Sequence, residues 1–145
     1  MNENFELLEY IYKDANMGCE SMTTLIKSLQ RKDNKIKNVI EDILKSYEKF
    51  LKESKKLLEK HKVKLKEEKI MPKMNAWMGV KMEVMRDNSD SSIAGMIIQG
   101  LTMGTINMEK RIDNYKENAD KNILKIAKDF YEFQETAIND LKKYL

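Results

Sequence analysis

The chain has 145 residues, of which 41% are hydrophobic and 35% are charged, and it contains only five glycines and one proline. This length fits a single domain, residues 1–145, with a substantial core. The composition favours long amphipathic helices over a β-sheet. The formal net charge is only +3, so charge gives no argument for nucleic acid or an acidic membrane as a partner.

Three features of the sequence bound the cellular location. Cys19 is the single cysteine, which excludes an internal disulfide and fits a reducing compartment. The first ten residues, MNENFELLEY, are acidic and lack the basic and apolar regions of a signal peptide. The longest apolar stretch, residues 93–104, is too short to span a bilayer. We therefore expect a cytoplasmic protein without a membrane partner.

The first predicted helix covers about residues 3–30. Its apolar residues recur at steps of three and four, the spacing of one helix face. These residues are Phe5, Leu8, Tyr12, Ala15, Cys19, Met22, Ile26 and Leu29. Gly18 interrupts the helix at a cost of about 1 kcal/mol relative to alanine, so we expect a close neighbour there.

The second predicted helix covers about residues 34–66, with Asp33 or Asn34 as its N-cap. The short polar run QRKDN joins it to the first helix, which makes the two helices antiparallel neighbours. Residues 45–69 hold ten lysines against five glutamates, a pattern typical of a solvated helix face. Nucleic-acid binding is not expected, because the chain has only three arginines to join these lysines.

Residues 71–87, MPKMNAWMGVKMEVMRD, contain five of the eleven methionines and the only tryptophan. The methionine spacing predicts a short helix over 73–86 with one apolar face. That face is open to three interpretations: a Cu(I) site, an adaptable docking surface, or packing on the rest of the domain. No histidine or cysteine supports the copper site, and we expect self-association or a protein partner here. The candidate partner-binding residues are Met71, Met74, Trp77, Met78, Met82 and Met85.

The third and fourth predicted helices cover about residues 92–118 and 121–145. The cluster DNSDSS (87–92) offers Asp90, Ser91 or Ser92 as the cap of the third helix. The connection between these two helices is very short, so they are antiparallel neighbours as well. The segment between the second and third helices is long enough to run back along the bundle, an arrangement that makes those two helices parallel.

Three polar residues fall on the apolar seams and form a candidate polar layer in the core: Tyr47, Ser54 and Gln134. Buried amides need hydrogen-bond partners, and Tyr47, Tyr12 or Thr105 are candidates to supply one to Gln134. The expected role of this layer is to fix the register of the helices.

Three stretches resemble helices of the ferritin-like, rubrerythrin-related superfamily. They are YEKFLKESKKLLEKH (47–61), GLTMGTINMEKRIDNY (100–115) and FYEFQETAINDLKKYL (130–145). The resemblance implies a small bacterial four-helix bundle in which two hairpins are joined by a long crossover containing a short extra helix. Members of this superfamily hold two metal ions between inward-facing carboxylates and histidines.

The positions that match those metal ligands carry other residues. They are Cys19 or Met22 in the first helix, Tyr47 and Phe50 in the second, Met108 in the third, and Gln134 and Ala137 in the fourth. The single histidine, His61, lies near the end of the lysine-rich helix. The resemblance therefore implies a bundle that has lost its metal centre, with no metal or cofactor site.

No nucleophile with a nearby base, phosphate-binding glycine loop or zinc-ligand spacing occurs in the sequence. We therefore expect a non-catalytic interaction or assembly module rather than an enzyme. The alternative is a ferritin-like di-metal or redox enzyme, in which Glu20, Glu48, Glu109 and Glu132 would have to turn inward.

Overall fold

The structure is a computed structural model that describes residues 3–63 and 88–145. These residues form four helices and no strand: α1 (Glu3–Ser28), α2 (Lys37–Lys60), α4 (Asp90–Tyr115) and α5 (Lys121–Lys142). The predicted all-helical architecture with four long helices is confirmed. The short helix predicted over 73–86 lies outside the described residues. None of the four helices combines the length and the apolar composition needed to cross a bilayer.

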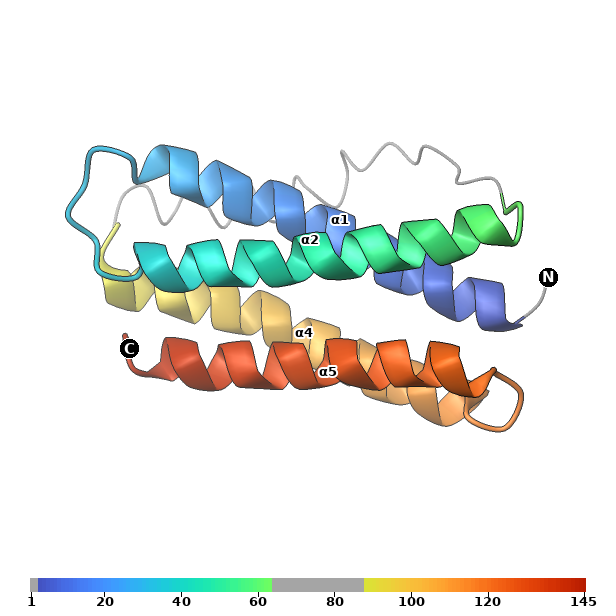
Figure 1. Cartoon of the computed structure of the whole chain (residues 1–145). Helices are drawn as coiled ribbons and strands as arrows, with labels where there is room; N and C mark the ends of the chain where they lie inside the picture. Colours follow the sequence, from blue (N-terminus) through green and yellow to red (C-terminus); the bar gives the residue numbers. More distant parts are fainter. Residues whose placement is uncertain (1–2, 64–87) are drawn as a thin grey trace.

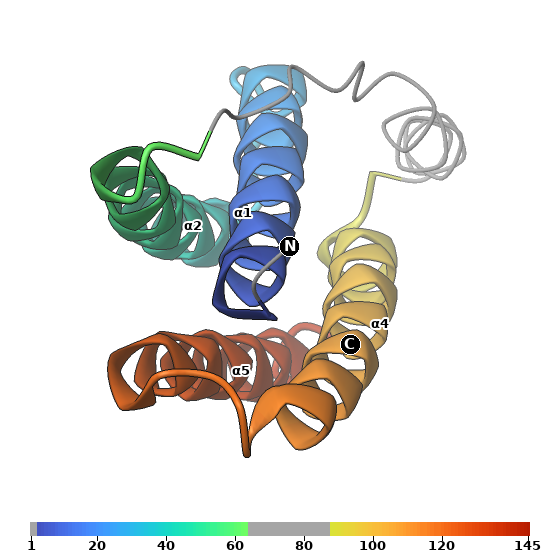
Figure 2. The same ribbon diagram turned by 90° about the vertical axis from the view of Figure 1, so that its right-hand side faces the viewer.

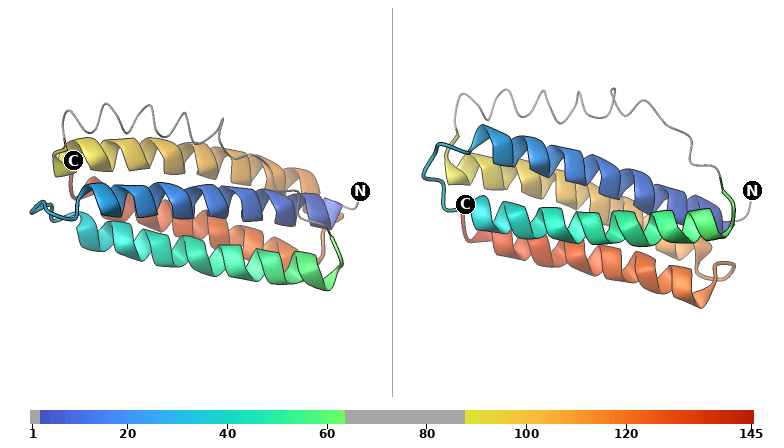
Figure 3. Two further views of the ribbon diagram at one scale, coloured as in Figure 1. Left: turned by 90° about the horizontal axis from the view of Figure 1, so that it is seen from above. Right: turned by 45° about the horizontal axis from the view of Figure 1, so that its top comes forward.

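The four helices form two antiparallel hairpins, α1 with α2 and α4 with α5 (Figure 1). Viewed along the bundle, α1 lies between α2 and α4, and α5 lies across from α1 (Figure 2). Helices α2 and α4 run in the same direction, so the end of α2 and the start of α4 lie at opposite ends of the bundle (Figure 3). This is the parallel arrangement that the long connecting segment allows.

The end of α2 differs from the prediction, because the helix stops at Lys60 rather than near residue 66. Lys62 has a positive φ of 57°, and its N–H donates to the carbonyl of Glu59 at 3.0 Å. The N–H of Val63 reaches back to the carbonyl of Leu58, also at 3.0 Å. These two bonds form a Schellman motif, which satisfies the last carbonyls of the helix and turns the chain away.

Both predicted N-caps are wrong. Helix α2 begins at Lys37 after Ile36, and Asn34 instead donates to Asp90 Oδ1 at 2.9 Å and to the carbonyl of Asn88 at 2.8 Å. The cap of α4 is Ser89, whose hydroxyl accepts from the N–H of Ser92 at 3.2 Å. Asn34 therefore ties the start of α2 to the start of α4, a contact between hairpins that local sequence patterns do not reveal.

The opposite end of the bundle has its own ties between hairpins. Asn4 is buried on α1, and its side-chain carbonyl accepts from the N–H of Asp120 at 2.7 Å. Tyr115 near the end of α4 donates to Glu6 on α1 at 2.8 Å. Polar contacts at both ends thus fix the position of one hairpin relative to the other along the bundle axis.

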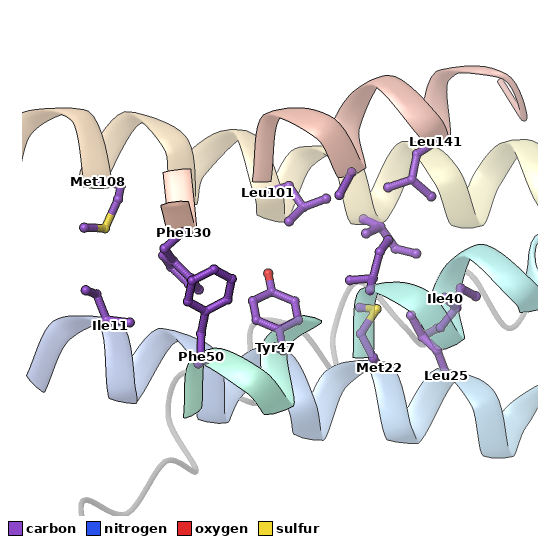
Figure 4. Packing of buried hydrophobic residues seen from close by; sticks show 14 of the residues in the cluster. Ile11, Met22, Leu25, Ile40, Tyr47, Phe50, Leu101, Met108, Phe130 and Leu141 are labelled. Atoms are coloured by element: carbon purple, nitrogen blue, oxygen red, sulfur yellow. The ribbon is translucent and has the colours of Figure 1, made fainter. Parts of the chain in front are cut away.

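The core follows the predicted seams in part, and Figure 4 shows its packing from close by. In α1 the predicted Leu8, Ala15 and Met22 are buried, but the other predicted positions Phe5, Tyr12, Cys19 and Ile26 are only half-buried. The largest fully buried side chains of the core are Phe130, Leu7, Leu8, Ile11, Met22, Ile36, Ile40, Leu58, Ile93, Ile97, Leu101 and Met108. Aromatic rings from α2 and α5 meet in its middle, where Phe50 and Phe130 pack edge to face with centroids 5.1 Å apart and Tyr47 and Phe133 do so at 4.9 Å. Such pairs contribute about 0.5–1.5 kcal/mol each beyond the area they bury.

Replacing Phe130 by alanine should cost about 3–5 kcal/mol of unfolding free energy, because it leaves a cavity between α2 and α5. Thr136→Ala on the exposed side of α5 is the control and should change stability by no more than about 0.5 kcal/mol. Urea unfolding followed by circular dichroism measures both. Equal effects of the two substitutions would contradict the packing described.

Candidate functional site

The three residues of the predicted polar layer are all buried, but they do not form one cluster. Ser54 donates to the carbonyl of Phe50 at 2.7 Å, within its own helix. It lies two turns, about 10 Å, beyond Tyr47 along α2. Thr105 likewise donates to the carbonyl of Thr102 at 2.8 Å. Tyr47 and Gln134 therefore remain as the buried polar groups in the middle of the bundle.

Gln134 on α5 is 0% exposed and its hydrogen-bond partner is Asp14 on α1. The amide Nε2 donates to Asp14 Oδ2 at 3.1 Å, which sets the orientation of the amide because a carboxylate accepts hydrogen bonds. The other amide atom, Oε1, is buried with no hydrogen-bond partner among the described residues. An unpaired buried acceptor costs about 1–3 kcal/mol, so the site carries unused hydrogen-bonding capacity.

Two glycines allow the helices to approach this layer closely. A Cβ atom on Gly104 of α4 would collide with Nε2 of Gln134. A Cβ atom on Gly18 of α1 would lie 2.5 Å from carbons of the Tyr47 ring. The close neighbour expected at Gly18 is thus the aromatic ring of Tyr47.

Tyr47 points its hydroxyl inward, toward α4 and α5 (Figure 4). Burial raises its pKa well above the ordinary tyrosine value, and the nearby Asp14 raises it further. Because a phenol with a raised pKa keeps its proton, Tyr47 is a neutral hydrogen-bonding group in this layer. It has no tendency to act as a base.

The layer reaches the surface at Tyr10 on α1, which faces α4. The Arg111 guanidinium lies 3.9 Å from the centroid of the Tyr10 ring, a cation–π contact. Burial, followed by Asp14, raises the pKa of Tyr10 to about 12, although Arg111 and a hydrogen bond with Asn107 act in the opposite direction. The edge of the layer is therefore a packed polar contact between α1 and α4.

Cys19 and Glu20 directly follow Gly18 on α1. Burial raises the pKa of the Cys19 thiol to about 11, and the carboxylates of Glu48 and Glu20 raise it further. Because the thiolate is the reactive form, this thiol is a poor nucleophile at neutral pH. One carboxylate oxygen of Glu20, Oε2, is buried without a hydrogen-bond partner among the described residues.

The acidic residues required by the di-metal alternative do not converge. Glu48, Glu109 and Glu132 are exposed on three different helices, whereas Glu20 is half-buried. In the ranges 3–63 and 88–145, no three His, Cys, Asp or Glu side chains form a group that could hold a metal ion. The inward positions are filled instead by Phe50, Met108, Gln134 and Ala137, all of them buried.

A second feature lies on the outer side of α4. Between Ser91 and Met108 the sequence contains no charged residue. Three large apolar side chains are exposed in the described part of the chain: Met103 (61%), Ile106 (45%) and Leu145 (65%). Leu145 reaches α4, because its Cδ2 lies 3.9 Å from where a Cβ of Gly95 would be.

We call Met103, Ile106 and Leu145 the apolar patch. These residues were not predicted as a binding surface from the sequence, although the uncharged run over residues 91–108 is a signal for one. Helices α2 and α5 carry lysine and glutamate on their outer sides, whereas α4 carries no charge over residues 91–108. The predicted partner-binding residues Met71, Met74, Trp77, Met78, Met82 and Met85 lie outside the described residues.

Comparison with family models, with curated proteins and with solved structures finds no match to this chain.

Gly18→Ala should destabilise the fold by about 1–3 kcal/mol, because the rigid ring of Tyr47 has to move to admit the methyl group. Gly95→Ala is the matched control. It places a methyl group at ordinary contact distance from Leu145 and should stabilise the helix by about 0.5–1 kcal/mol. Chemical denaturation measures both changes. A stabilising effect of Gly18→Ala would contradict the close approach of Tyr47.

Proposed function

We propose that this protein is a non-catalytic assembly module, a four-helix bundle of ferritin-like topology whose metal centre has been lost. It associates with further copies of itself through the apolar patch on α4, with a different protein partner as the other possibility. The exposed Met103, Ile106 and Leu145 are the observation that carries the proposal. Met103 and Ile106 are three residues apart and therefore neighbours on the surface of α4, and contiguous exposed apolar surface is typical of binding sites.

The ferritin-like part of the proposal is supported by the course of the chain. Two antiparallel hairpins whose second and third helices run parallel need a long crossover between them (Figure 1). The middle of the bundle, where such proteins place carboxylates and histidines, is occupied by Tyr47, Phe50, Phe130 and Gln134. These side chains fill space and fix helix positions, which is a structural role.

The alternative, a di-metal or redox enzyme, has less support. It would require Glu48, Glu109 and Glu132 to leave the solvent and enter a core that is already filled. Moving a carboxylate from water into such an interior without a compensating cation costs several kcal/mol. Glu20 is the single candidate that already has a buried carboxylate oxygen.

The test is the effect of charge on self-association. Sedimentation velocity over a range of concentrations should show association of the unaltered chain, and the double variant Met103→Lys/Ile106→Lys should stay monomeric. An unpaired ammonium in an apolar contact costs several kcal/mol, so Kd should rise at least about a hundredfold, at about 1.4 kcal/mol per factor of ten.

The control is Asn122→Lys/Thr136→Lys, which adds the same charge at exposed positions of α5 and should leave association unchanged. Far-UV circular dichroism should be the same for all three proteins. An unaltered chain that is monomeric at every concentration would overturn self-association, as would a double variant that associates as tightly as the control.

A further inference from the structure

The methionines in the described part of the chain differ sharply in exposure. Met22, Met96 and Met108 are buried, with 1%, 6% and 0% of their surfaces exposed. Met17 is half-buried, whereas Met103 is 61% exposed. Of the methionine sulfurs that the structure describes, that of Met103 is therefore the most accessible to a dissolved reagent.

The thiol of Cys19 competes poorly with this thioether for an oxidant. The thiolate is the form of cysteine that oxidants attack. Burial, followed by the carboxylates of Glu48 and Glu20, raises the pKa of the Cys19 thiol to about 11. Because little thiolate exists at neutral pH, and because the side chain is half-buried, this cysteine is a poor redox sensor.

Met103 lies in uncharged surroundings on α4. The surface neighbours of a helical residue lie three and four positions away, and for Met103 these are Gln99, Gly100, Ile106 and Asn107. None of them carries a charge, and Ile106 is itself 45% exposed. The apolar character of this surface therefore depends on Met103 and Ile106, and half of that pair is lost if the sulfur becomes polar.

We propose that Met103 is an oxidation site that controls self-association through the apolar patch. The thioether allows association and the sulfoxide prevents it. Methionine sulfoxide is polar, and reductases convert it back to methionine, so the modification is reversible. This inference rests on the proposed assembly function and adds the regulation of its surface.

The oxidant is hydrogen peroxide, which accepts two electrons. Sδ of Met103 attacks one peroxide oxygen, so that the O–O bond breaks and an S–O bond forms. The sulfur gives up two electrons to the peroxide. The proton of the transferred oxygen passes to the departing hydroxide, which leaves as water. The products are methionine sulfoxide and water, and no further reactant is needed.

Oxidation and association are coupled because both use the same side chain. A contact between copies covers Met103 and shields its sulfur, so peroxide reacts with the unassociated chain. A sulfoxide oxygen enclosed in an apolar contact lacks a hydrogen-bond donor, which disfavours the contact. Each process therefore opposes the other to the same extent: association slows oxidation, and oxidation keeps the chain monomeric.

The test combines peroxide treatment with sedimentation velocity and peptide mass spectrometry. The untreated chain should associate. Mild treatment should oxidise Met103 before Met22, Met96 and Met108, and Kd should then rise at least about tenfold, which corresponds to about 1.4 kcal/mol. Oxidation of Met103 should be slower at protein concentrations above Kd, and methionine sulfoxide reductase should restore association.

Met103→Leu is the matched control, because leucine keeps an apolar side chain that peroxide does not oxidise. This variant retains Cys19 and all other methionines, so oxidation elsewhere in the chain affects it equally. It should associate before and after treatment. Met103→Gln, which places an uncharged polar side chain at the same position, should weaken association without any oxidant.

Three results would overturn the regulation and leave the assembly function standing. The first is unchanged association of a chain whose Met103 is fully oxidised. The second is an equal loss of association by treated Met103→Leu, and the third is oxidation of Met22, Met96 and Met108 ahead of Met103. An untreated chain that is monomeric at every concentration would overturn the assembly function and its regulation together.

Discussion

The close approach of helices in the middle of the bundle is the constraint on which the other packing depends. Tyr47 lies against the backbone of α1 at Gly18, and Gln134 lies against the backbone of α4 at Gly104. Each contact joins the two helices of one hairpin, α1 with α2 and α4 with α5, and leaves no room for an additional methyl group. Because protein interiors are close-packed, these two contacts set the helix separations that the apolar layers on either side then fill.

The same contacts determine what chemistry the interior offers. The buried polar groups Tyr47 and Gln134 act as neutral hydrogen-bonding groups, and Asp14 supplies the acceptor for the Gln134 amide. Aromatic rings occupy the neighbouring space. The outer surface of α4 is chemically different, with uncharged side chains over five turns. The interior stabilises the fold, and the proposed self-association would use the surface of α4.

The helices could be predicted from sequence because a long helix that buries one side must repeat its apolar residues every three or four positions. The hydrogen-bond partner of Gln134 could not be predicted from sequence. Asp14 lies on another helix, and its contact with Gln134 depends on the register between α1 and α5. Asn34 was predicted as a local cap, but its contacts with α4 are tertiary. The exposure of Met103 and Ile106 was not predicted either. Residues 91–108 contain no charged residue, so the sequence there does not distinguish the exposed side of the helix from the buried side.

The most direct test of the proposal that the bundle has lost its metal centre is metal binding by the purified chain. After incubation with iron(II) or manganese(II) and removal of unbound ions, elemental analysis should find no stoichiometric metal, and Tm should not rise. Buried rings at Phe50 and Phe130 and the Gln134 amide fill the middle of the bundle. Two ions bound per chain, lost when Glu20 is replaced by glutamine, would contradict the account.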